Sequence, residues 1–184
     1  MISEVDLIKL CRKNDRKGQQ QLFDLFKRKV MGICLRYASS RMEADDILQE
    51  AFIKIFHSLI RNETIEIVSL GAWIHRITTN TAITFYYKER NNNGVLQLDQ
   101  VNEKNSVVSA ESVLEALNEE ELLSLIQEMP LGYRMVFNLA IIEGFDHREI
   151  GNKLGITESS SRSQLTRAKA WLKERITKKE LLYG

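Results

Sequence analysis

Residues 145–172 read FDHREIGNKLGITESSSRSQLTRAKAWL, and this stretch decides the fold of the C-terminal part of the chain. Gly155 ends one short helical segment and supplies a turn, Ile156 returns to the core, and Thr157 or Glu158 starts a second helix. Five positions follow the order apolar, small, apolar, glycine, apolar that is typical of a helix-turn-helix: Ile150, Gly151, Leu154, Gly155 and Ile156. The stretch therefore predicts two helices that cross closely.

The second helix of this pair is strongly basic. Between residues 159 and 179 it carries seven lysine or arginine side chains and one acid, Glu174. Its first turns hold short or forked hydrogen-bonding side chains that suit base edges and phosphates: Ser159, Ser160, Arg162, Ser163 and Gln164. We favour DNA reading over an ordinary solvated basic face. Ser161 departs from the pattern, because most helix-turn-helix sequences have an apolar core residue there.

The rest of the chain also has the period of helices. Apolar residues recur in steps of three and four, which predicts helices over residues 18–38, 42–60, 70–90, 115–129, 133–143, 147–154 and 158–179. Ser3, followed by Asp6, predicts the start of a further short helix. Among 184 residues there is one proline, Pro130, and there are nine glycines, which favours helices over a many-turned β fold. We predict an all-α fold.

Composition and charge suggest two domains. Residues 1–95 carry 15 basic and 11 acidic side chains. Residues 96–130 carry one basic and eight acidic side chains, and residues 131–184 carry ten basic and six acidic side chains. Two mildly basic blocks thus flank an acidic stretch, a layout that suits two DNA-facing domains joined by a linker. Residues 95–112 lack apolar periodicity, so we place a domain over 1–92, a flexible linker over 93–112 and a second domain over 113–184.

Several classes of protein are disfavoured. No apolar run approaches the roughly 20 residues that span a bilayer, and no signal peptide is visible, so we expect a cytoplasmic protein without membrane insertion. Cys11 and Cys34 have no metal or redox spacing and are interpreted as reduced core residues. The three histidines are far apart, and no phosphate loop or nucleophile elbow occurs. We therefore expect no enzyme, metal or cofactor.

Two further helices carry candidate surfaces. Opposite the apolar face of the helix over 42–60, a polar stripe contains one aliphatic residue, Ile53, beside Asp46, Gln49 and Glu50. Acids near a helix start have an electrostatic explanation, whereas a polar stripe with an aliphatic centre is typical of a docking face, and the residues alone leave both open. On the helix over 70–90, aromatic residues alternate with basic ones and with Asn80, which suits unpaired bases, although core packing explains them more simply.

Three segments, ADDILQEAFIKIF (44–56), WIHRITTNTAI (73–83) and residues 129–172, together resemble the extracytoplasmic-function sigma factors of bacterial RNA polymerase. The likeness covers about residues 5–90 and 112–178 in order and spacing. It implies that Asp46, Gln49, Glu50 and Ile53 dock on the clamp of the largest polymerase subunit. It further implies contacts with the flap, and regulation by an anti-sigma protein.

The resemblance also assigns DNA contacts. The loop 61–70 and the helix after it match the part that melts the promoter and captures minus-ten bases, which implicates Arg61, Asn62, Trp73, Arg76 and Asn80. The basic helix matches the reader of the minus-thirty-five element, which implicates Ser159, Ser160, Arg162, Ser163, Thr166 and Arg167. Thr84 stands where family members often have an aspartate, and Ser161 where they usually have a valine.

The resemblance predicts an alternative sigma factor that binds core polymerase and directs promoter-specific initiation. The main alternative is a helix-turn-helix regulator that binds DNA without polymerase, but it explains neither the polar stripe nor the second basic and aromatic block. A helical adaptor or anti-termination protein is a third reading, and an enzyme is the least favoured.

Overall fold

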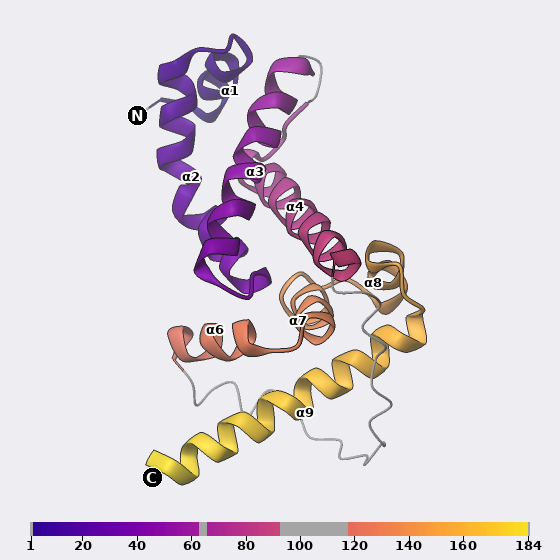
Figure 1. Ribbon diagram of the computed structural model, residues 1–184. Coiled ribbons are helices and arrows are strands. Elements are labelled where there is room, and N and C mark those ends of the chain that lie inside the picture. The colour runs from indigo at the N-terminus through magenta and orange to yellow at the C-terminus, as the bar shows by residue number, and fades with distance from the viewer. Residues whose placement is uncertain (1, 63–65, 93–117, 184) are drawn as a thin grey trace. The chain divides into compact units, whose positions relative to one another are not determined.

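The computed structural model describes residues 2–62, 66–92 and 118–183 (Figure 1). Every regular element within these residues is a helix, which confirms the predicted all-α fold. The chain divides into two compact units, Met1–Phe85 and Tyr86–Gly184. The expected linker over 93–112 lies outside the described residues, and the domain limits drawn from the sequence stay predictions. No helix in the described ranges has both the length and the apolar character to cross a membrane.

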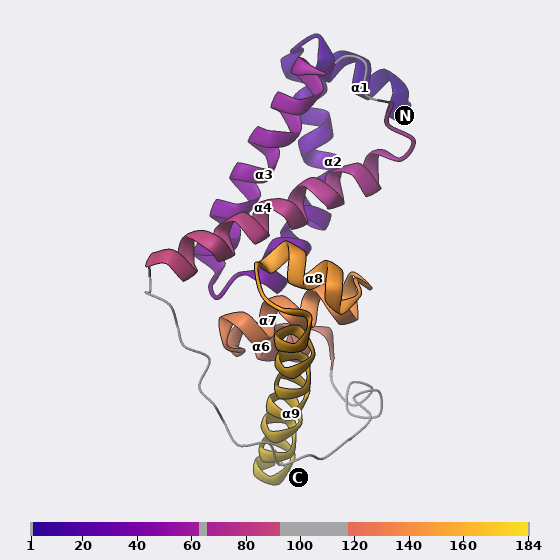
Figure 2. The ribbon, with the colours of Figure 1, turned by 90° about the vertical axis from the view of Figure 1, so that its right-hand side faces the viewer.

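The first unit consists of α1 (Glu4–Arg12), α2 (Arg16–Tyr37), α3 (Arg41–Arg61) and most of α4 (Leu70–Asn92). Helices α1, α2 and α3 pack against one another (Figure 2). The buried positions are those that the apolar period predicts, among them Leu7, Leu22, Val30, Ile47, Ile55, Leu59 and Ile74. Helix α4 begins against α2, where a Cβ on Gly71 would lie 3.8 Å from Phe26 Cε1. One shared apolar core thus holds the helices whose outer faces carry the candidate contacts.

Side-chain caps decide where these helices begin. Ser3, Asp15, Ser40 and Ser69 each accept a hydrogen bond from the backbone N–H three residues later, at 3.1, 2.7, 3.2 and 3.3 Å respectively. Such bonds satisfy N–H groups that lack a partner within the helix. The cap at Asp15 explains why α2 begins at Arg16, two residues before the sequence-based limit.

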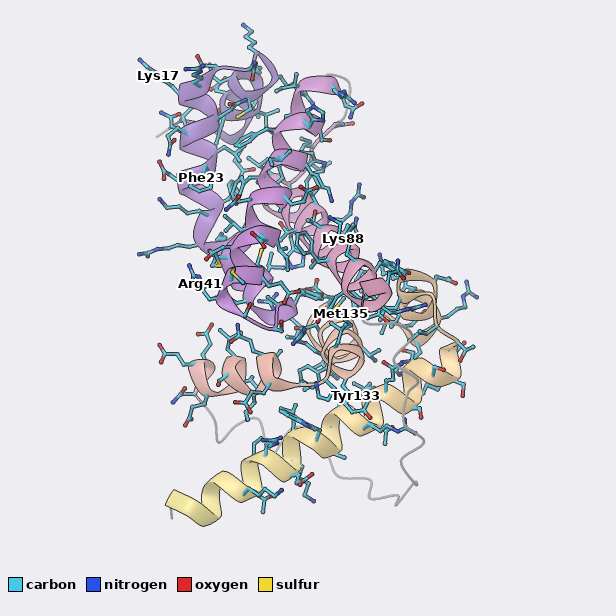
Figure 3. All side chains as sticks on the ribbon, viewed as in Figure 1. Lys17, Phe23, Arg41, Lys88, Tyr133 and Met135 are labelled. Carbon is cyan, nitrogen blue, oxygen red and sulfur yellow. The ribbon has the colours of Figure 1, made fainter. Side chains whose placement is uncertain are left out.

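The second unit contains α6 (Glu119–Glu128), α7 (Leu131–Phe137), η1 (Asn138–Ile142), α8 (His147–Leu154) and α9 (Glu158–Tyr183). Its core joins α6, α7 and α9 through Leu125, Ile126, Met129, Phe137, Ala168, Leu172 and Ile176. Tyr133 points from α7 toward α9 and packs against this core (Figure 3). The core therefore fixes the inner face of α9 and leaves the other face outward.

The prediction of a single α-helix over 133–143 is wrong. Helix α7 starts at Leu131, and its continuation is η1, a π-helix in which the N–H of Glu143 donates to Asn138 O, five residues back, at 3.0 Å. The buried amide of Asn138 donates to Arg134 O at 2.8 Å. Over five residues, apolar spacing cannot distinguish a π-turn from an α-turn, so the sequence could not reveal it.

The two cysteines lead to a first prediction. Both are free and buried, and burial raises the pKa of Cys11 to about 11 and that of Cys34 to about 12. Since the thiolate is the reactive form, we expect neither thiol to react with a maleimide at pH 7.5 while the chain is folded, and both to react in denaturant. Mass spectrometry of the labelled protein checks this. Rapid labelling of the folded chain would contradict the core assignment.

Candidate nucleic-acid interface and docking surface

Helices α8 and α9 form the predicted helix-turn-helix. Asp146 caps α8 in a reciprocal arrangement, because its side chain accepts from Glu149 N at 2.7 Å while its own N–H donates to Glu149 Oε2 at 2.9 Å. Gly155 ends α8 in the left-handed conformation, with φ 63° and ψ 41°. A Cβ on Gly151 would lie 2.8 Å from Ile156 O, so the close crossing expected at this position is confirmed.

The candidate reading residues share the outward face of α9. Ser159, Arg162 and Thr166 are exposed, and Ser160, Ser163 and Arg167 are half-buried. The opposite face is buried at Ser161, Gln164, Ala168, Leu172 and Ile176, again in steps of three and four. The hydroxyl of Ser160 accepts from Thr157 Oγ1 at 2.9 Å as part of the cap of α9, so it also has a structural role. This face can enter a major groove with its N-terminal turns first.

The sequence reasoning missed a partner of Arg162. Its guanidinium forms an ion pair with Glu158, one turn earlier on α9, and the two side chains are 65% and 45% exposed. Exposed pairs of this kind contribute only about 0.2–1 kcal/mol. Breaking this ion pair would therefore cost Arg162 little free energy.

Ser161 lies fully buried between the two helices. Its Oγ forms a hydrogen bond with Nδ1 of His147, the first residue of α8, at 2.9 Å. The polar residue at an expected apolar position is thus accommodated by a partner that the spacing of the sequence does not indicate.

A second candidate surface lies on α3, opposite its buried face. Asp46 and Gln49 are exposed, Glu50 is half-buried and pairs with Lys54 at 3.4 Å, and Ile53 is 60% exposed. We call these four residues the α3 stripe: Asp46, Gln49, Glu50 and Ile53. An isoleucine this exposed contributes little to the core of its own unit, while a partner could bury it.

Met42 extends the α3 stripe by one turn, and the sequence reasoning missed it. It is 76% exposed and precedes Asp46 by four residues, on the same side of α3. In the sequence, residue 42 served only to mark the start of the helix over 42–60. The spacing to Asp46 was the signal that could have identified it.

The third surface is on α4. Trp73 is half-buried, and Arg76 and Asn80 are exposed, all on one side of the helix. Arg61 and Asn62 are exposed at the end of α3, whereas residues 63–65 of the expected loop lie outside the described residues. Near the end of α4, the guanidinium of Arg90 lies 6.0 and 5.9 Å from the ring centroids of Tyr86 and Tyr87. This side of α4 thus presents the amide of Asn80 and the guanidinium of Arg76 beside the indole of Trp73.

Residue types that could bind a metal ion do not gather in the described part of the chain. No group of three or more histidine, cysteine, aspartate or glutamate side chains is gathered there as a metal ion would require.

Comparison with known proteins matches each unit to a family model. Residues 22–92 match "Sigma-70 region 2", and residues 119–172 match "Sigma-70, region 4". The chain is 28% identical to the ECF RNA polymerase sigma factor SigW of Bacillus subtilis, over 92% of this chain and 94% of that protein. It is 27% identical to the RNA polymerase sigma factor SigZ of the same species, over 84% and 85%. A solved structure of CnrH in complex with the cytosolic domain of CnrY is 19% identical, over 93% and 95%, with a TM-score of 0.47.

Proposed function

The chain belongs to the extracytoplasmic-function sigma factors of bacterial RNA polymerase, and from that premise we propose how its faces divide the work of promoter recognition. As an alternative sigma factor it directs promoter-specific transcription initiation. The polymerase core supplies catalysis, and this chain acts without enzymatic activity or a cofactor of its own. Its place of action is the cytoplasm.

The α3 stripe is the surface for the clamp of the largest polymerase subunit. One observation carries this proposal: an isoleucine that is 60% exposed lies among polar side chains, on the helix face opposite the core. Interfaces commonly have an apolar anchor surrounded by a polar rim, and Ile53 with Met42 fits that description. In the second unit, the exposed pair Ile141 and Ile142 on η1 is a corresponding apolar surface for the flap.

Both DNA elements are read by faces that point away from the cores. Ser159, Arg162, Ser163 and Thr166 of α9 contact bases of the minus-thirty-five element in the major groove, while Ser160 and Arg167 lie beside them. Trp73, Arg76 and Asn80 of α4, with Arg61 and Asn62, hold minus-ten bases that have left the duplex. Each contact set is modest, and joining the two on one chain raises the effective concentration of the second.

Asn80 provides a second prediction. Its exposed amide can bond the edge of an extruded base, and a bond of this kind is worth about 0.5–1.5 kcal/mol. We expect Asn80→Ala to slow open-complex formation about threefold to tenfold on duplex promoters, with much smaller losses on promoters that are already melted. Stopped-flow fluorescence on the two templates measures this. Equal losses on both templates would show that Asn80 is structural.

An anti-sigma protein is the regulator that family membership supports. The exposed apolar groups on α3 and η1 are surfaces that such a protein would cover, and covering them would prevent docking on polymerase. Because both partners would use the α3 stripe, Ile53→Asp in the full-length chain should weaken binding to the anti-sigma protein as well as to core polymerase.

The experiment that tests the proposed function is co-purification. The tagged full-length chain, mixed with bacterial core polymerase, should elute with core on size-exclusion chromatography at 0.15 M salt. A regulator that binds DNA without polymerase would elute alone and still shift promoter fragments. Failure to bind core, with retained binding to DNA, would favour that alternative.

A further inference from the structure

The inner face of α9 changes character along its length. From its third turn onward it inserts Ala168, Leu172 and Ile176 into the apolar core of the second unit. Its N-terminal half, the part that would enter the groove, has Ser161 and Gln164 at the corresponding buried positions. The first turns of α9 therefore bury polar side chains at positions where the period of an amphipathic helix predicts apolar ones.

A hydrogen bond, which depends on direction, holds the Ser161 side chain in place. It is 0% exposed, and its Oγ lies 2.9 Å from His147 Nδ1. Apolar side chains tolerate sliding, because burial depends little on direction, whereas a hydrogen bond weakens steeply when its angle departs from linearity. Losing the bond would also leave a buried polar group without its partner. The pair therefore favours one rotation of α9 relative to α8.

A second contact lies one turn further along α8. The N–H of Ile156 donates to Gly151 O at 3.1 Å, and a Cβ on Gly151 would lie 2.8 Å from Ile156 O. Gly151 thus holds the end of the turn, and His147, four residues earlier, holds Ser161 inside α9. A Cβ on Gly151 would also lie 3.5 Å from Glu158 N, so Gly151 permits the close approach of the start of α9, while the bond from His147 to Ser161 favours one rotation of α9.

Rotation matters because the reading side chains lie far from the axis. Side-chain ends are about 5–6 Å from the axis of a helix, so a rotation of about 10° moves them by about 1 Å. Hydrogen bonds to base edges tolerate a range of only about 0.5 Å. A small rotation would therefore move Arg162 and Thr166 from base edges toward the backbone.

We propose that His147 and Ser161 are positioning residues that set the rotation of α9 and thereby the base preference at the minus-thirty-five element. Neither needs to touch DNA, and Ser161 is too deeply buried to do so. The inference rests on the proposed function, in which α9 reads that element.

The test uses the full-length chain bound to core polymerase and a library of promoters with single-base changes in the minus-thirty-five element. Ser161→Ala should lower discrimination between the best element and its variants at least about threefold, a part of the roughly 5- to 150-fold that one good base contact supplies. Core affinity and the salt dependence of promoter binding should not change. His147→Ala should reproduce the loss, and the double variant should lose no more than either single variant.

Thr177→Ala is the matched control, since Thr177 is an exposed β-hydroxyl residue on the same helix. If Ser161→Ala does not fold, His147→Ala carries the same test from a half-buried position at the helix start. Unchanged discrimination in the folded variants, or additive losses in the double variant, would overturn the inference. A wild-type chain with no minus-thirty-five preference would instead overturn the proposed function of α9.

Discussion

Ile53→Asp is expected to weaken binding to core polymerase about 30-fold or more while the chain keeps its fold. The side chain is 60% exposed, so its replacement removes little from the core of the first unit. In the docked state the same side chain would be buried, which is worth about 1.5–3 kcal/mol for an aliphatic group. A carboxylate in its place would also lose hydration, and anchors of this kind commonly cost 2 kcal/mol or more when altered.

Leu25→Asp is the matched control for this measurement. Leu25 is 58% exposed, and it lies on α2 rather than on α3. Fluorescence anisotropy of labelled chain titrated with core polymerase gives both affinities, and circular dichroism checks the fold. Equal affinities for wild type and Ile53→Asp, or a comparable loss for Leu25→Asp, would contradict docking through the α3 stripe.

The second large effect concerns Arg162. A forked guanidinium can bond a guanine edge twice, and such a contact contributes about 1–3 kcal/mol of discrimination. We expect Arg162→Ala to remove preference at one position of the minus-thirty-five element and to leave the other positions unchanged. The cost of breaking its exposed pair with Glu158 is small by comparison.

Lys173→Ala separates base reading from phosphate contact. Lys173 is exposed further along α9, where phosphates or solvent are expected. Its replacement should weaken binding to all promoters alike and reduce the salt slope by about one ion. Binding to a promoter library at several salt concentrations distinguishes the two variants. A uniform loss with a lower salt slope for Arg162→Ala would reassign Arg162 to a phosphate contact.

Local rules predicted most of the helices and the helix-turn-helix. Gly155 adopts the left-handed conformation that a helix end requires, and Gly151 allows the close crossing because it has no Cβ. Both follow from the chemistry of the residue at that position. The outward face of α9 followed equally from the period, since residues at steps of three and four share a side.

Contacts between distant residues could not be predicted in this way. The bond from Ser161 to His147 joins residues 14 positions apart, and no spacing rule pairs them. The ion pair of Arg162 with Glu158 has ordinary helical spacing, but Glu158 was read as the start of the helix rather than as a partner. Met42 was likewise read only as the start of its helix. In each case a residue had two compatible roles, and only the packing distinguished them.

As a sigma factor, this chain gives core polymerase its choice of promoter. Run-off transcription with bacterial core polymerase, the full-length chain and a genomic template library tests it most directly, with start sites mapped by sequencing. We expect transcription starts that depend on the chain and share two upstream elements, one near minus ten and one near minus thirty-five. Starts that are the same with and without the chain, or that share no upstream elements, would contradict it.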